Sequence, residues 1–152
     1  MERLLACSRL VVVATAVTLL ACASSGTTRD TVAKAPAGEA RVAQIYFWRA
    51  KPGKAEEYTR YIRERAEPID EEARRAGAFI SVTTFMASDT TVPWTHMRVF
   101  MLRDSTQLRA LGDALTAAGA RIQPDSAKRR EQSEYSASLR DRVGATVVEV
   151  VR

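Results

Sequence analysis

One segment limits the possible folds of this chain more than any other. Residues 42–49 read VAQIYFWR and are dense in β-branched and aromatic side chains, as is typical of a β-strand. Alternate side chains of a strand point to opposite sides, so one set is Val42, Gln44, Tyr46 and Trp48, and the other is Ala43, Ile45 and Phe47. Because both sets are largely apolar, we expect a central strand in a sheet that is covered on both faces.

The next segment, residues 54–75, predicts a helix that follows the turn Lys51-Pro52-Gly53-Lys54. Its apolar residues, from Tyr58 to Ala73, recur at steps of three and four. Pro68 lies inside this pattern, and because its backbone lacks an N–H group we expect the helix to kink or split there.

The remaining segments complete a known order of elements. Residues 78–87 and 94–103 predict two strands, residues 104–119 a helix with a leucine stripe, residues 125–141 a charged surface helix, and residues 145–151 a last strand. The order β-α-β-β-α-β predicts a ferredoxin-like α+β fold, with a four-stranded antiparallel sheet and its helices on one face. Since the other face is also apolar, we expect a second copy to cover it in a homodimer.

The start of the chain predicts export. Arg3 and Arg9 precede an uncharged apolar run that ends near residue 21, and this run is shorter than the roughly 20 residues of a membrane span. We therefore interpret residues 1–21 as a signal peptide, residues 22–40 as a flexible tether rich in Ser, Thr, Gly and Ala, and residues 41–152 as the folded domain.

Two cleavage routes fit the end of this signal peptide. Ala21-Cys22-Ala23 suits an ordinary signal peptidase, whereas Leu19 to Cys22 resembles the lipobox of bacterial lipoproteins, in which the cysteine is lipidated. We favour lipidation of Cys22, because a lone thiol is otherwise unexplained in an oxidising compartment. The expected location is the periplasmic face of the outer membrane through this lipid anchor, or the periplasm or medium if Cys22 is not lipidated.

A resemblance to a known family rests on two stretches, Val42-Ala43-Gln44-Ile45-Tyr46 and Lys51-Pro52-Gly53-Lys54-Ala55-Glu56-Glu57-Tyr58. They are similar to the opening of dimeric α+β barrel proteins, which include the antibiotic-biosynthesis monooxygenases and NIPSNAP-type domains. The resemblance implies a homodimer with a pocket between sheet and helices in each subunit. Some such proteins oxidise aromatic substrates without a cofactor, and some bind or degrade haem, but no catalytic set of theirs matches this sequence.

Charge and composition exclude other classes. The net charge of +5 is spread over mixed-sign segments such as residues 60–75, so we expect no nucleic-acid partner. The chain has one histidine and no carboxylate cluster at ligand spacing, so we expect no metal site and no cofactor.

The candidate site is built around the only histidine, His96, which is also the candidate catalytic residue. The expected ligand-binding residues share the helix-facing side of the sheet with it or lie on the first helix: Tyr46, Trp48, Tyr58, Trp94, His96 and Arg98. The interpretation that we favour for His96 itself is a structural histidine at a sheet edge or dimer seam.

The function expected from these features is binding. We expect an exported, lipid-anchored domain that binds a small apolar or aromatic molecule or a protein partner, with no defined activity. The alternative is a cofactor-independent, monooxygenase-like enzyme acting on an aromatic substrate, or a haem-binding protein that uses His96.

Overall fold

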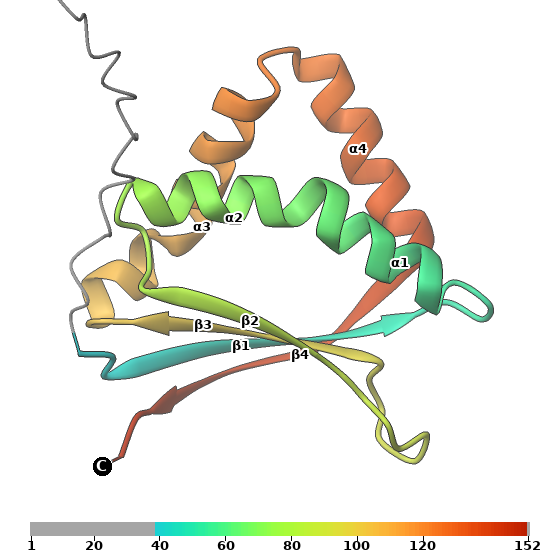
Figure 1. Ribbon diagram of the computed structural model, residues 1–152, viewed down its shortest axis with the longest axis horizontal. Helices are drawn as coiled ribbons and strands as arrows, with labels where there is room; N and C mark the ends of the chain where they lie inside the picture. The colour runs from blue at the N-terminus through green and yellow to red at the C-terminus, as the bar shows by residue number, and fades with distance from the viewer. Residues whose placement is uncertain (1–38, 152) are drawn as a thin grey trace, which may run out of the picture. The chain divides into compact units, whose positions relative to one another are not determined.

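The architecture is one sheet with a layer of helices on it. The computed structural model describes residues 39–151. Its elements are β1 (Val42–Ala50), α1 (Ala55–Tyr61), the π-helical segment η1 (Ile62–Ala66), α2 (Glu67–Arg75), β2 (Ser81–Met86), β3 (His96–Leu102), α3 (Ser105–Ile122), α4 (Ser126–Leu139) and β4 (Arg140–Glu149). The strand order is β2-β3-β1-β4, and every neighbouring pair is antiparallel. With all helices on one face (Figure 1), the predicted ferredoxin-like fold is confirmed.

β1 is a central strand, as predicted, with β3 on one side and β4 on the other. Its cross-strand pairs fix which side chains share a face, because directly opposed residues point the same way. Tyr46 pairs with Arg98 and Trp48 with His96, and these side chains lie on the helix-covered face. The alternate residues of β1 and β3 lie on the face that the helices leave open.

The first helical layer is interrupted before Pro68. The backbone N–H of Glu67 donates to the carbonyl of Ile62, five residues earlier, which is the bonding of a π-helix. Pro68 then occupies the first turn of α2, where its missing N–H is tolerated. The predicted split is therefore a π segment inside one continuous helical run.

The second half of the domain differs from the prediction at the boundary between its last helix and its last strand. Asp104 caps α3 by accepting hydrogen bonds from the N–H groups of Thr106 and Gln107, at 2.8 and 2.9 Å. α4 ends at Leu139 and β4 begins at Arg140, not at Ala145, because residues Arg140 to Arg142 continue the ladder with β1. β4 thus starts in a segment that we predicted as surface helix.

β2 and β3 are shorter than predicted. β2 begins at Ser81, after a turn in which Phe79 is buried, and β3 begins at His96. Trp94 therefore precedes β3, and the alternation that we extended to it does not hold: its ring packs on Phe47, 5.9 Å between centroids, on the open face.

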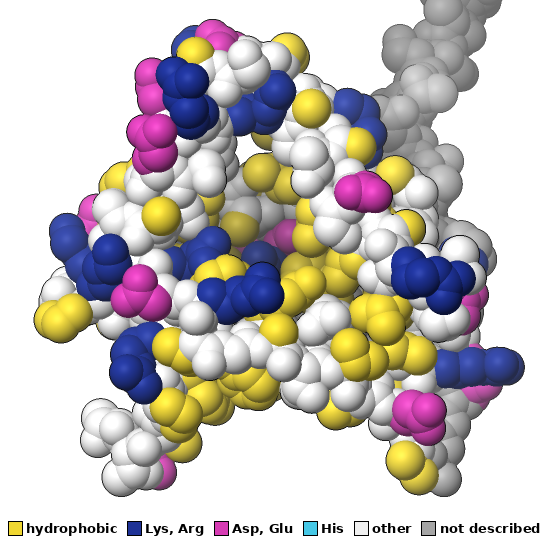
Figure 2. All heavy atoms as spheres, turned by 180° about the vertical axis from the view of Figure 1, so that it is seen from behind, with side chains coloured by type: hydrophobic (Ala, Val, Ile, Leu, Met, Phe, Trp, Pro, Cys, Tyr) yellow, Lys and Arg dark blue, Asp and Glu magenta, His cyan; other side chains and the backbone are white. Residues whose placement is uncertain are grey.

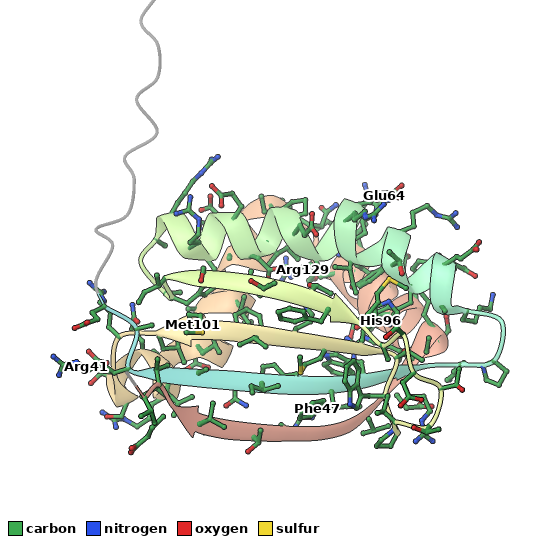
Figure 3. All side chains as sticks on the ribbon, turned by 60° about the horizontal axis from the view of Figure 1, so that its bottom comes forward. Arg41, Phe47, Glu64, His96, Met101 and Arg129 are labelled. Carbon is green, nitrogen blue, oxygen red and sulfur yellow. The ribbon has the colours of Figure 1, made fainter. Side chains whose placement is uncertain are left out.

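The open face carries Ile45, Phe47, Met97, Val99 and Met101 in the middle of the sheet, all partly exposed. Figure 3 shows Phe47 and Met101 on the side of the sheet away from the helices.

The expected signal peptide, residues 1–21, and most of the expected tether, including Cys22, lie outside the described residues. None of the helices in residues 39–151 combines the length and apolar character needed to span a membrane.

Candidate functional site

A cavity of about 780 Å³ lies between the helix-covered face of the sheet and the helices. α3 and α4 rise from the sheet as an arch, and Figure 2 shows the hollow beneath it, with basic and hydrophobic side chains at its base. Its walls come from every helix and from three strands: Trp48, Tyr61, Ala66, Ile69, Asp70, Arg98, Leu115, Thr116, Gly119, Arg129, Gln132, Ser133, Ser136, Ala137, Arg140, Asp141 and Arg142. We refer to it as the arch cavity.

An ion pair joins the sheet to the helices at the base of the arch cavity. Arg98 on β3 donates from Nη2 to Oδ2 of Asp70 on α2, and their side chains are 12% and 6% exposed. Burial raises the pKa of Asp70, while the positive charge of Arg98 acts in the opposite direction. A buried pair of this kind fixes the distance between its two elements more than it stabilises them.

Arg140 occupies the neighbouring position, at the start of β4. Its guanidinium lies 3.4 Å from the centroid of the Trp48 ring and 5.4 Å from that of Tyr58. Both distances are within the range of cation–π attraction. Burial lowers the pKa of the Arg140 guanidinium, which remains a cation at neutral pH.

Tyr58 lies behind these groups, outside the lining of the cavity. It is 2% exposed, and burial raises its pKa to about 12. Its ring stacks with Tyr61, which lines the arch cavity, and meets the His96 ring edge-on at 4.6 Å. Tyr58 therefore stands between His96 and the aromatic side of the cavity.

His96 is fully buried, and each of its ring nitrogens lies within hydrogen-bond distance of a hydroxyl group. Nε2 lies 3.0 Å from Oγ1 of Thr59, and Nδ1 lies 2.9 Å from Oγ1 of Thr95. Each hydroxyl can also donate to a backbone carbonyl, Thr59 to Ala55 at 2.9 Å and Thr95 to Trp48 at 3.3 Å, so the tautomer sets which ring nitrogen donates and which accepts. This set satisfies a neutral imidazole. Haem ligation or proton transfer by His96 would require one of these contacts to break.

The structure brings only part of the predicted site together. Trp48 and Arg98 line the arch cavity. Tyr46 lies on the same face, with its ring centroid 6.4 Å from that of Trp48. Tyr58 and His96 lie behind the cavity wall, and Trp94 is on the opposite face of the sheet.

Most residues of the cavity were not found by sequence reasoning, and Asp70, Ser136 and Arg140 are the most consequential of them. Asp70 and Ser136 lie in helices where the pattern predicts solvent-facing polar residues, yet both are 4% exposed. Arg140 was missed because residues 125–141 were predicted as a surface helix, whereas β4 begins at Arg140. The ladder between β1 and β4 also shifts register between Phe47 and Trp48. If the side chains of β4 alternated without a break from its apolar C-terminal end, Asp141 and Val143 would point to the cavity side. Because of the bulge, Arg140 and Arg142 point there.

The chemistry that this arrangement supports is recognition of a ring and of charge. In residues 39–151, no group of three or more His, Cys, Asp or Glu side chains is placed to hold a metal ion.

Comparison with known proteins supports the fold alone. No protein-family model matches the chain, and no curated protein matches it. HapK from Hahella chejuensis is a similar solved structure, with 11% identity and a TM-score of 0.51 over 72% of this chain and 92% of that chain. PA3566 from Pseudomonas aeruginosa has 18% identity and a TM-score of 0.44 over 75% and 95%. A dimeric protein of unknown function and ferredoxin-like fold from Bacteroides fragilis NCTC 9343 has 11% identity and a TM-score of 0.46 over 74% and 97%.

The burial of His96 predicts an acid-sensitive fold. Burial lowers the pKa of His96 below the ordinary value of 6.5. The stability that the neutral ring contributes is present above pH 6.5 and is lost as the pH falls from there through the lower pKa of the folded state. Because His96 is the only histidine, its imidazole resonances can be followed by NMR without assignment.

We expect a midpoint below 6.5 in the folded protein, and His96→Gln should remove part of the loss of stability at acid pH. An imidazole that titrates at or above 6.5 would show that water reaches the ring.

Proposed function

We propose that this chain is a binding module that holds a small aromatic molecule in the arch cavity. The observation that carries the proposal is the aromatic wall of the cavity: Trp48 and Tyr61 line a space of about 780 Å³ that the protein's own side chains do not fill. Small-molecule sites are concave, largely apolar and a few hundred Å³ in volume, with a few polar groups that orient the ligand.

Trp48 is a built-in reporter for this proposal. The only other tryptophan, Trp94, lies on the opposite face of the sheet, so Trp94→Phe leaves Trp48 as the sole indole. We expect saturable changes in Trp48 fluorescence on titration with 2-naphthoate or 2-naphthamide, two aromatic probes of the same shape.

Ala137→Phe should weaken binding of these probes, because Ala137 lines the cavity and a ring there occupies the ligand's space. We expect about a tenfold loss of affinity, or about 1.4 kcal/mol, because the ligand must give up contacts in the space that the ring takes. Ala127→Phe, at an exposed position near the start of the same helix and outside the cavity, is the matched control. Equal binding by both variants would place the ligand elsewhere.

We also propose that the protein is a homodimeric α+β barrel, related to the antibiotic-biosynthesis monooxygenases and NIPSNAP-type domains. Two observations support it. The Lys51–Lys54 turn joins β1 to α1 in the way that the resemblance implies, with Gly53 at a φ of 72°. The open face of the sheet presents a large apolar surface in its middle, and a facing sheet would pack on it about 10 Å away. Stable interfaces bury roughly 800 Å² per partner.

Val99→Lys tests the dimer. Val99 lies on β3 between Arg98 and Phe100, whose side chains face the helices, so Val99 belongs to the open face. We expect light scattering to give the mass of two chains for the native protein and of one chain for Val99→Lys, because a buried unpaired ammonium is costly. Val151→Lys, at a side chain that is 89% exposed beyond β4, should remain dimeric. A native monomer would contradict the proposal.

We propose, finally, that the protein is exported and anchored by lipid at Cys22. The support is the sequence of residues 1–22, which precede the described residues. Mass spectrometry of protein from the membrane fraction should show an acylated Cys22, and Cys22→Ser should release the protein. A Cys22→Ser protein that stays membrane-bound would contradict the anchor.

A further inference from the structure

Buried polar atoms that lack a hydrogen-bond partner belong to residues around the arch cavity. Within residues 39–151, the buried side-chain atoms without a hydrogen-bond partner are Arg98 Nε, Ser136 Oγ and Arg140 Nε. All three residues line the arch cavity, although they come from β3, α4 and β4. Buried polar groups are nearly always hydrogen-bonded, so three such atoms around one cavity indicate a missing hydrogen-bond partner.

The charges that line the cavity also favour an additional partner, one that is negatively charged. Four arginines line it, against the two carboxylates of Asp70 and Asp141. Arg98 is compensated by Asp70, and Nη1 of Arg129 donates to the carbonyls of Gln123 and Pro124. Among the described residues, no carboxylate lies within ion-pair distance of Arg140, whose side chain is partly buried. A cation in that position costs free energy unless an anion joins it.

We propose that the ligand is an organic anion, an aromatic carboxylate, whose carboxylate group binds at Arg140 and Ser136. This inference rests on the proposed function and adds the chemical class of the ligand. The planar guanidinium of Arg140 is already oriented by stacking on Trp48, and guanidinium groups bind carboxylates through paired hydrogen bonds. Ser136 Oγ supplies a further donor, and the ligand's ring lies toward Tyr61.

An inorganic anion fits these observations less well. The cavity is far larger than one phosphate or sulfate ion, and its walls include Ile69 and Leu115 as well as the aromatic rings. A ligand that fills it needs an apolar body in addition to a charged end.

Comparison of the two probes tests the inference by calorimetry at neutral pH. We expect 2-naphthoate to bind about tenfold or more tightly than 2-naphthamide, which has the same shape and no charge, because hydrogen bonds to a charged group are the stronger ones. Arg140→Gln should reduce the affinity for 2-naphthoate to that for 2-naphthamide. Arg130→Gln, on the exposed side of α4 and outside the cavity, is the matched control and should change neither affinity.

The outcomes separate this inference from the proposed function. If both probes bind equally, the cavity binds rings but the anion inference is overturned. If neither binds, the proposed function itself fails.

Thermal unfolding without a probe distinguishes a ligand-binding Arg140 from a structural one. We expect Arg140→Gln to leave the Tm nearly unchanged, because the variant removes an unpaired cation together with its contacts with the Trp48 and Tyr58 rings. A lowered Tm with unchanged affinity for 2-naphthoate would show that the guanidinium serves the fold, and would overturn the inference.

Discussion

The helices are attached to the sheet by two separate apolar clusters, and the rest of the structure follows from the gap between them. One cluster, with Phe79, Phe100, Leu102 and Leu111, packs closely because Ala73 and Ala118 are small and fully buried. The other joins Ala50, Tyr58, Ile62 and Leu139 where α1 and α4 meet β1. Between the two, β3 presents Arg98 instead of an apolar residue, and the layers are held apart by a polar contact with Asp70. The arch cavity occupies this interval.

The fold could be predicted from the sequence because its evidence is local. The β-branched and aromatic run of β1, the three- and four-residue period of the first helix and the cap at Asp104 are each visible in a short stretch. The first helical run and α3 also follow from an apolar stripe on each. These patterns depend on burial, which sequence periodicity records directly.

The candidate site was less predictable because its residues are charged and lie far apart in the sequence. Arg98 was found through its neighbours on β3, but Asp70 looks like an ordinary solvent-facing acid in an otherwise charged helix. Trp94 was placed on the wrong face because β3 begins at His96, and a strand end is set by backbone pairing and not by side-chain type. The uneven register of β4 has one local sign in the sequence, Gly144 beside the shift, because a glycine inside a strand often marks a bulge.

The bulge of β4 also bears on how chains of this fold are compared with one another. An uninterrupted ladder would turn Arg140 and Arg142 to the opposite side of the sheet and leave two arginines and two aspartates around the cavity, so its excess of positive charge would be lost without any substitution. Two homologues with the same residues along this strand can therefore differ in ligand specificity. Two homologues with different residues there can share the same specificity. Strand register decides which residues of β4 line the cavity, so an alignment that ignores the bulge assigns the wrong columns to the cavity.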